Sequence, residues 1–223
     1  FIAWLVPIRE SGSMLPQLAI ANVIRQCKVR KWVWVVGALV QALCIVAMLV
    51  SALTLTGHTA GYAIIASLIV FSLARGFNSI ASKDVLGKVI PKQQRGNISG
   101  LAASFAGFAT LTFGLGLWYL QTLGFENGVY IALMLAVVMW LFAALSYSQI
   151  KEYAGATEGA KNGLVHALSK LAILYEDKQF AHFVFTRALL LCSALSAPFY
   201  IVLASEQAFD FSLLATFMAL SGL

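Results

Sequence analysis

Long apolar runs separated by short polar intervals dominate this chain of 223 residues. Six of the runs reach about the 20 residues that an α-helix needs to cross a hydrocarbon layer roughly 30 Å thick. A seventh run begins near Phe209. The pattern therefore predicts an all-α, polytopic membrane protein, with helices over residues 1–24, 32–55, 61–82, 98–121, 129–150 and 180–204.

The composition supports the membrane interpretation. Hydrophobic residues make up 61% of the chain and charged residues only 11%, whereas a soluble domain carries about 25% charged residues. A water-soluble core of this size could not bury so much apolar surface.

Basic residues are confined to alternate polar intervals. The net charge is +6, and 14 of the 15 Lys and Arg fall into three groups, whereas the intervals 55–60, 121–128 and 205–211 contain none. By the positive-inside rule, this alternation predicts that intervals 25–31, 83–97 and 151–179 face the cytoplasm. It also explains the basic charge without a nucleic-acid partner. The groups are Arg25, Lys28, Arg30 and Lys31; Arg75, Lys83, Lys88, Lys92 and Arg95; and Lys151, Lys161, Lys170, Lys178 and Arg187.

Enzyme and metal chemistry are not indicated. The three Cys are odd in number and lack metal spacing, and the three His are far apart in the sequence. Neither a nucleophile elbow nor a phosphate loop occurs. We therefore expect no enzyme activity, no cofactor and no metal.

Polar residues at membrane depth distinguish two of the predicted helices. A charge near the bilayer centre costs roughly 2.5–3.5 kcal/mol on insertion scales, so such residues face a protein interior or a wet cavity. Segments 1–24 and 61–82 should line that interior, while the nearly polar-free segments 32–55 and 129–150 should face lipid. These side chains could bind a substrate or proton, or form a structural network between helices. The candidates are Arg9, Glu10, Gln17, Arg75 and Asn78.

Asp84 is the only acid in the second basic interval. It can pair with Lys88, one helical turn later, or with a basic residue of the first basic interval. Such a pair would break when the inner side of a transporter opens, which makes Asp84 a gate candidate. A solvated loop charge is the alternative.

The interval 151–179 is the longest polar stretch. Residues 152–163 hold three Gly and mixed charges, which predicts a flexible link. Leu164, Leu168, Leu171 and Tyr175 then recur with helical spacing, which predicts an amphipathic helix at the membrane surface. Upstream, Gly96, Gly100 and Ser104 lie four residues apart and predict close helix packing.

Together these features resemble the major facilitator superfamily, and the runs Val6–Ser13 and Lys83–Lys92 are similar to those of its bacterial members. The resemblance implies part of a twelve-helix, two-half bundle. Residues 1–150 would hold helices 2–6 of the first half without helix 1, residues 151–179 the link, and residues 180–223 the start of the second half. Arg30 and Lys31 match the basic end of the family's signature loop and join Asp84 as gate candidates. Asn22 and Val29 stand where that loop has its two Gly, and Gln26 stands where it has its acid.

The resemblance implies a secondary active transporter that moves a small solute across the bacterial inner membrane by alternating access. Its partners would be the lipid bilayer, an unknown small-molecule substrate and a coupling proton or ion. A non-transporting relative, acting as a sensor or assembly partner, is the alternative. We also expect an upstream span, because the charge alternation places Phe1 on the outer side.

Overall fold

The computed structural model describes residues 8, 20–21, 23–24, 26–122, 128–155, 175 and 177–194. Within these residues the chain forms five helices and no strand, which confirms the all-α prediction. The helices are α3 (Lys31–Thr54), α4 (Gly57–Val89), α5 (Lys92–Thr122), α6 (Gly128–Ser148) and α9 (Lys178–Ala194).

Four of these helices, α3 to α6, are long and apolar enough to cross a membrane. They coincide with the second to fifth apolar runs of the sequence. The described part of the chain is therefore compatible with a multi-pass membrane protein.

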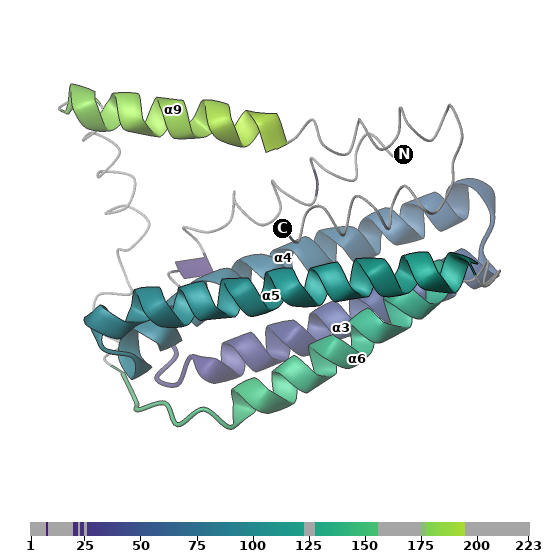
Figure 1. Cartoon of the computed structure of the whole chain (residues 1–223), viewed down its shortest axis with the longest axis horizontal. Coiled ribbons are helices and arrows are strands. Elements are labelled where there is room, and N and C mark those ends of the chain that lie inside the picture. The colour runs from purple at the N-terminus through teal and green to yellow at the C-terminus, as the bar shows by residue number, and fades with distance from the viewer. Residues whose placement is uncertain are drawn as a thin grey trace.

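Helix α3 lies between α4 and α6 and packs against both (Figure 1). The turn from α3 to α4 consists of Leu55 and Thr56, followed by Gly57 with a φ of +63°. This left-handed conformation costs a residue with a Cβ about 1–2 kcal/mol, whereas glycine adopts it freely. The glycine allows α4 to return alongside α3 after only two residues.

The turn from α4 to α5 corrects the expected loop at 83–97. Helix α4 continues to Val89 and α5 begins at Lys92, so only Ile90 and Pro91 lie between them. The hydropathy falls at Lys83, but a helix satisfies its own backbone hydrogen bonds and can continue beyond the membrane. It stops before Pro91, which favours the extended conformation seen at Ile90 (φ −113°, ψ 128°).

Helix α3 is also less peripheral than its sequence predicts. It is the most buried of the four membrane helices, with 44% of its apolar stretch buried against 22% or less in the others. Gln41 is fully buried, while Val36, Leu43 and Val50 on another face are exposed. The helix therefore meets its neighbours on one side and presents an apolar face on the other.

Aromatic side chains join α3 to α6 near one end of both helices. The rings of Trp34 and Tyr147 stack with centroids 4.0 Å apart, and Trp140 lies 6.5 Å from Trp34. Beside them, Val35 and Ala38 pack on Ala144. These contacts fix the start of α3 against the end of α6.

Several predictions fall on other parts of the chain. Most of segment 1–24, the amphipathic helix at 164–175 and the run that begins near Phe209 lie outside the described residues. Helix α9 coincides with the first part of the run 180–204. The small residues of α5 do not pack closely on described neighbours, because a Cβ added at Gly96 or Gly100 would meet nothing within 4 Å.

Candidate functional site

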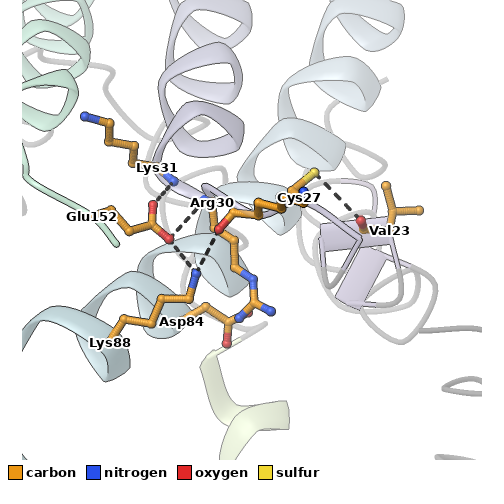
Figure 2. A network of polar contacts seen from close by, with 8 residues as sticks. Val23, Cys27, Arg30, Lys31, Asp84, Lys88 and Glu152 are labelled. Carbon is orange, nitrogen blue, oxygen red and sulfur yellow. Dashed lines mark hydrogen bonds and ion pairs between the residues drawn. The ribbon is translucent and has the colours of Figure 1, made fainter. Parts of the chain in front are cut away.

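The start of α3, the end of α4 and the segment after α6 meet at one end of the bundle, where their charged side chains converge (Figure 2). All three predicted basic intervals contribute to this convergence, which places them on the same side of the described bundle. We call this group the basic-end cluster. Its members are Arg30, Lys31, Asp84, Lys88 and Glu152.

Glu152 is the centre of the basic-end cluster, and its side chain is inaccessible to solvent. Its Oε1 accepts hydrogen bonds from the backbone N–H of Arg30 at 3.0 Å and from Lys88 Nζ at 2.7 Å. Its Oε2 accepts one from the backbone N–H of Lys31 at 2.6 Å. Since these two amides begin α3, the carboxylate caps that helix and faces the positive end of its dipole.

The pKa of Glu152 reflects two opposing effects. Burial by itself would raise the pKa, because it disfavours the charged carboxylate. The hydrogen bonds from Lys88 and from the backbone of Arg30 and Lys31, together with the charge of Lys88, outweigh burial and lower the pKa below its ordinary value. The group is therefore held as an anion.

Lys31 performs the reciprocal role for α6. Its Nζ donates to the backbone oxygens of Ser148 at 2.9 Å and Ile150 at 2.8 Å. Carbonyl groups at the end of a helix lack partners within the helix and carry the negative end of its dipole. Lys31 thus caps α6 while Glu152, which follows α6, caps α3.

Asp84 pairs with Arg30 rather than with Lys88. The Arg30 Nη1 lies 3.0 Å from Asp84 Oδ2, so of the two partners expected for Asp84, the one in the first basic interval is confirmed. The Arg30 side chain is 14% exposed and that of Asp84 is 35% exposed. This half-buried pair connects the start of α3 to the end of α4.

Lys88 and Gly155 fasten the segment after α6. Lys88 Nζ donates to the backbone oxygen of Lys28 at 3.3 Å as well as to Glu152, and the Gly155 N–H donates to the same oxygen at 2.9 Å. A Cβ added at Gly155 would lie 2.6 Å from Lys88 Nζ. Residues 152–155, predicted as part of a flexible link, are therefore docked on α4 and on the loop before α3.

Asn78 lies inside the α3–α4 interface, where it is 5% exposed. With its amide oriented so that donors meet acceptors, Asn78 Nδ2 donates to the Trp34 oxygen and its oxygen accepts from Gln41 Nε2, both at 3.1 Å. Gly37 makes room for this side chain. These contacts support a helix-packing role for Asn78. Its role in substrate binding stays a prediction.

The other predicted binding residues have different outcomes. Arg75 is half-buried on α4, one turn before Asn78. Arg9, Glu10 and Gln17 lie outside the described residues. The structure therefore brings together the predicted gate candidates Arg30, Lys31 and Asp84, and the predicted substrate-binding set stays a prediction.

Sequence reasoning missed Glu152. A lone acid in a Gly-containing polar stretch resembles a solvated link residue, and its spacing to α3 carries no local signal. One available clue was the start of α3, which has no acidic residue in its first turn and no side-chain cap of its own. A helix start of this kind needs a partner from elsewhere.

The chemistry that this geometry supports is ionic and structural. Within the described residues no three His, Cys, Asp or Glu side chains are grouped so that they could hold a metal ion. What the basic-end cluster offers instead is a set of charge contacts that join two helices and the segment after a third. In comparisons with known proteins, the chain matches no protein-family model, no curated protein and no solved structure.

Proposed function

We propose that this chain belongs to a secondary active transporter similar to the major facilitator superfamily, in which the basic-end cluster is the gate on the cytoplasmic side of the bacterial inner membrane. The observation that carries the proposal is the ionic closure of one end of the bundle. Arg30–Asp84 joins α3 to α4, and Glu152 joins the segment after α6 to both helices.

The position of these contacts suits a gate. They lie at helix ends, whereas the buried pair Gln41 and Asn78 lies in the interior of α3 and α4, so the ionic contacts can break without separating this pair. The Arg30–Asp84 pair is partly exposed to water and has a small net free energy, because hydration of the separated charges compensates for most of their attraction. A transporter that alternates between two states needs contacts of this reversible kind.

Glu152 also gives the link a mechanical role in this proposal. Residue 151 begins the predicted link between the two halves, and Glu152 and Gly155 dock its first residues on α3, α4 and the preceding loop. A displacement of the second half would pull on this segment and strain the ionic contacts of the basic-end cluster. The proposed substrate site involves Arg9, Glu10, Gln17 and Arg75 at membrane depth.

The test is solute flux through the full-length protein in proteoliposomes. A thermal-shift screen of a solute panel first selects a compound that binds, and uptake of the same compound in radiolabelled form is then measured. We expect Arg9→Ala and Glu10→Gln to abolish uptake while the protein still inserts and retains its thermal transition.

The gate is tested with Asp84→Asn, with Lys83→Gln as the matched control. Lys83 is the adjacent exposed charge on α4, so its neutralisation changes the surface charge without removing the pair to Arg30. Asp84→Asn should change the uptake rate severalfold and Lys83→Gln should leave it unchanged. Absence of uptake for every bound solute would overturn the transport proposal and favour the non-transporting sensor or assembly partner.

A further inference from the structure

An apolar groove of about 560 Å³ lies between α3 and α4. Val36 and Val40 of α3 form one wall, Val70 and Leu73 of α4 form the other, and Ile24 lies at one end. The volume falls within the roughly 300–1,000 Å³ of typical small-molecule sites. All the lining residues are apolar apart from the indole N–H of a tryptophan, so the groove selects a hydrocarbon occupant.

The groove opens toward the outside of the α3–α4 pair. Val36 is 58% exposed and Val70 is 47% exposed, although both line it. Because α3 and α4 cross the membrane, an open apolar groove on their surface lies at the depth of the lipid chains. From Trp32 to Val40 it follows α3 over nine residues, or about 12 Å along the helix axis.

The end of the groove coincides with the basic end of the bundle. Lys28 is exposed and lies in the loop between two residues of the groove wall, Ile24 and Trp32. Trp32 is 53% exposed, and Lys31 Nζ lies 5.2 Å from its ring. An exposed tryptophan beside lysines is typical of the level of the lipid headgroups.

Charge at this end favours an anionic headgroup. Residues 26–31, 83–97 and 151–155, which surround this end, contain eight Lys and Arg against two acids, and both acids, Asp84 and Glu152, already have cationic partners. The remaining positive charge attracts anionic lipids by about 1 kcal/mol per basic residue near the surface. The apolar groove matches the acyl chain of an anionic phospholipid, and the basic residues at its end match the headgroup of the same molecule.

We infer that the α3–α4 groove is a binding site for an anionic phospholipid of the leaflet at the basic end. One acyl chain lies along Val36 and Val40, and the phosphate faces Lys28. The inference rests on the membrane position of α3 and α4 and is independent of transport, so failure of either proposal leaves the other standing.

Native mass spectrometry of the full-length protein tests the inference. Delipidated protein in detergent is titrated with phosphatidylglycerol and, separately, with phosphatidylcholine of the same chains. We expect the first phosphatidylglycerol to bind at least about fivefold more tightly, the factor that corresponds to 1 kcal/mol from a single basic residue. Equal affinity for the two lipids would overturn the inference.

Two matched pairs of variants locate the site. Val36→Phe fills the groove, whereas Val50→Phe adds the same bulk at a 50% exposed position of α3 outside it. Lys28→Gln removes the proposed headgroup contact, whereas Lys92→Gln removes the same charge from α5, which does not line the groove. Val36→Phe and Lys28→Gln should each reduce phosphatidylglycerol affinity about fivefold or more, and the controls should change it less than twofold.

Leu73→Phe provides a second groove-filling variant from the α4 wall and is used in place of Val36→Phe if that protein does not fold. If neither filling variant weakens phosphatidylglycerol binding relative to Val50→Phe, the lipid binds elsewhere and the inference is wrong. The same holds if Lys92→Gln reduces affinity as much as Lys28→Gln, because the preference would then come from the overall charge.

Discussion

The backbone N–H of Lys31 donates to Glu152 Oε2 at 2.6 Å, although the two residues are separated by 121 positions in the sequence. The side chain of the same Lys31 caps the carbonyls at the end of α6, the helix that precedes Glu152. Glu152 thus stabilises the positive end of the α3 dipole, and Lys31 stabilises the negative end of the α6 dipole. This arrangement makes the basic-end cluster sensitive to single substitutions.

Glu152→Gln should destabilise the protein by about 2 kcal/mol, the scale of hydrogen bonds to a charged group. The substitution removes the charge that faces Lys88 and the first amides of α3. Thermal unfolding of the purified protein in detergent, followed by circular dichroism, measures the effect. Lys151→Gln, at the neighbouring exposed position, is the control and should change stability by less than about 0.5 kcal/mol.

A double-mutant cycle separates the Glu152–Lys88 pair from the cap. Lys88→Met keeps the length of the side chain and removes its charge. The two single variants and the double variant should show a coupling of about 1 kcal/mol or more, because the residues are in direct contact at 2.7 Å. Additive effects would contradict the pair that the structure shows.

Acid should remove the contribution of Glu152. Because the folded-state pKa lies below the ordinary value of 4.5, the stabilisation is complete above about pH 4.5 and is lost as the pH falls through the folded-state pKa. The difference in melting temperature between the wild type and Glu152→Gln should therefore be constant at neutral pH and shrink below pH 4.5. A difference that stays constant to pH 3 would contradict the assignment.

Gly37→Ala should loosen the α3–α4 interface. A Cβ at this position would lie 2.9 Å from Asn78 Cγ and closer still to one of the two terminal atoms of its amide, so Asn78 must leave its place beside Gln41. We expect a loss of about 2 kcal/mol, the scale of overpacking in a core. Gly87→Ala is the control on α4, where a Cβ meets nothing within 4 Å, and it should be neutral or stabilise by up to about 1 kcal/mol.

Gly57→Ala should cost about 1–2 kcal/mol through backbone strain alone, since the φ of +63° disfavours any residue with a Cβ. The space around Gly57 is open, so a steric clash is excluded as the cause. Gly116→Ala, also in open space but in ordinary helical conformation, should show no loss. Equal effects of the two substitutions in thermal unfolding would refute the strain argument.

Membrane topology can be mapped with cysteines in a background without the native Cys. Single cysteines at Lys92 and Lys151 should react with a membrane-impermeant thiol reagent from the same side, because both positions lie at the basic end of the helices. A cysteine at Thr56, in the turn between α3 and α4, should react only from the opposite side. Labelling of all three positions from one side would contradict the multi-pass arrangement.

Much of the fold could be predicted because the signals are local. Runs of about 20 apolar residues located α3 and α6 to within two residues, whereas α5 begins at Lys92, six residues before the predicted start at 98. The alternation of basic and non-basic intervals predicted that the basic intervals lie at one end of the bundle. Hydropathy did not predict the last two turns of α4, because the helix continues through Lys83 and Lys88 after the apolar residues end. The backbone hydrogen bonds of an α-helix do not depend on the polarity of its side chains.

The candidate site was predicted only in part. The gate candidates Arg30, Lys31 and Asp84 could be selected because charge is sparse in this chain and each lies at the end of an apolar run. Glu152 could not be selected, because its importance comes from its burial and from three donors supplied by two distant helix ends. Neither property leaves a pattern in the sequence around it.

The amino-acid sequence alone determined which segments are long and apolar enough to cross a membrane, since this follows from the transfer free energies of neighbouring side chains. It also determined which ends of these segments are basic. Only the tertiary structure decided that Asp84 pairs with Arg30, that Lys88 pairs with Glu152 and that α3 lies buried between two helices. Those outcomes depend on which helix ends meet in space, and a contact between residues more than 50 positions apart has a free energy that no local pattern encodes.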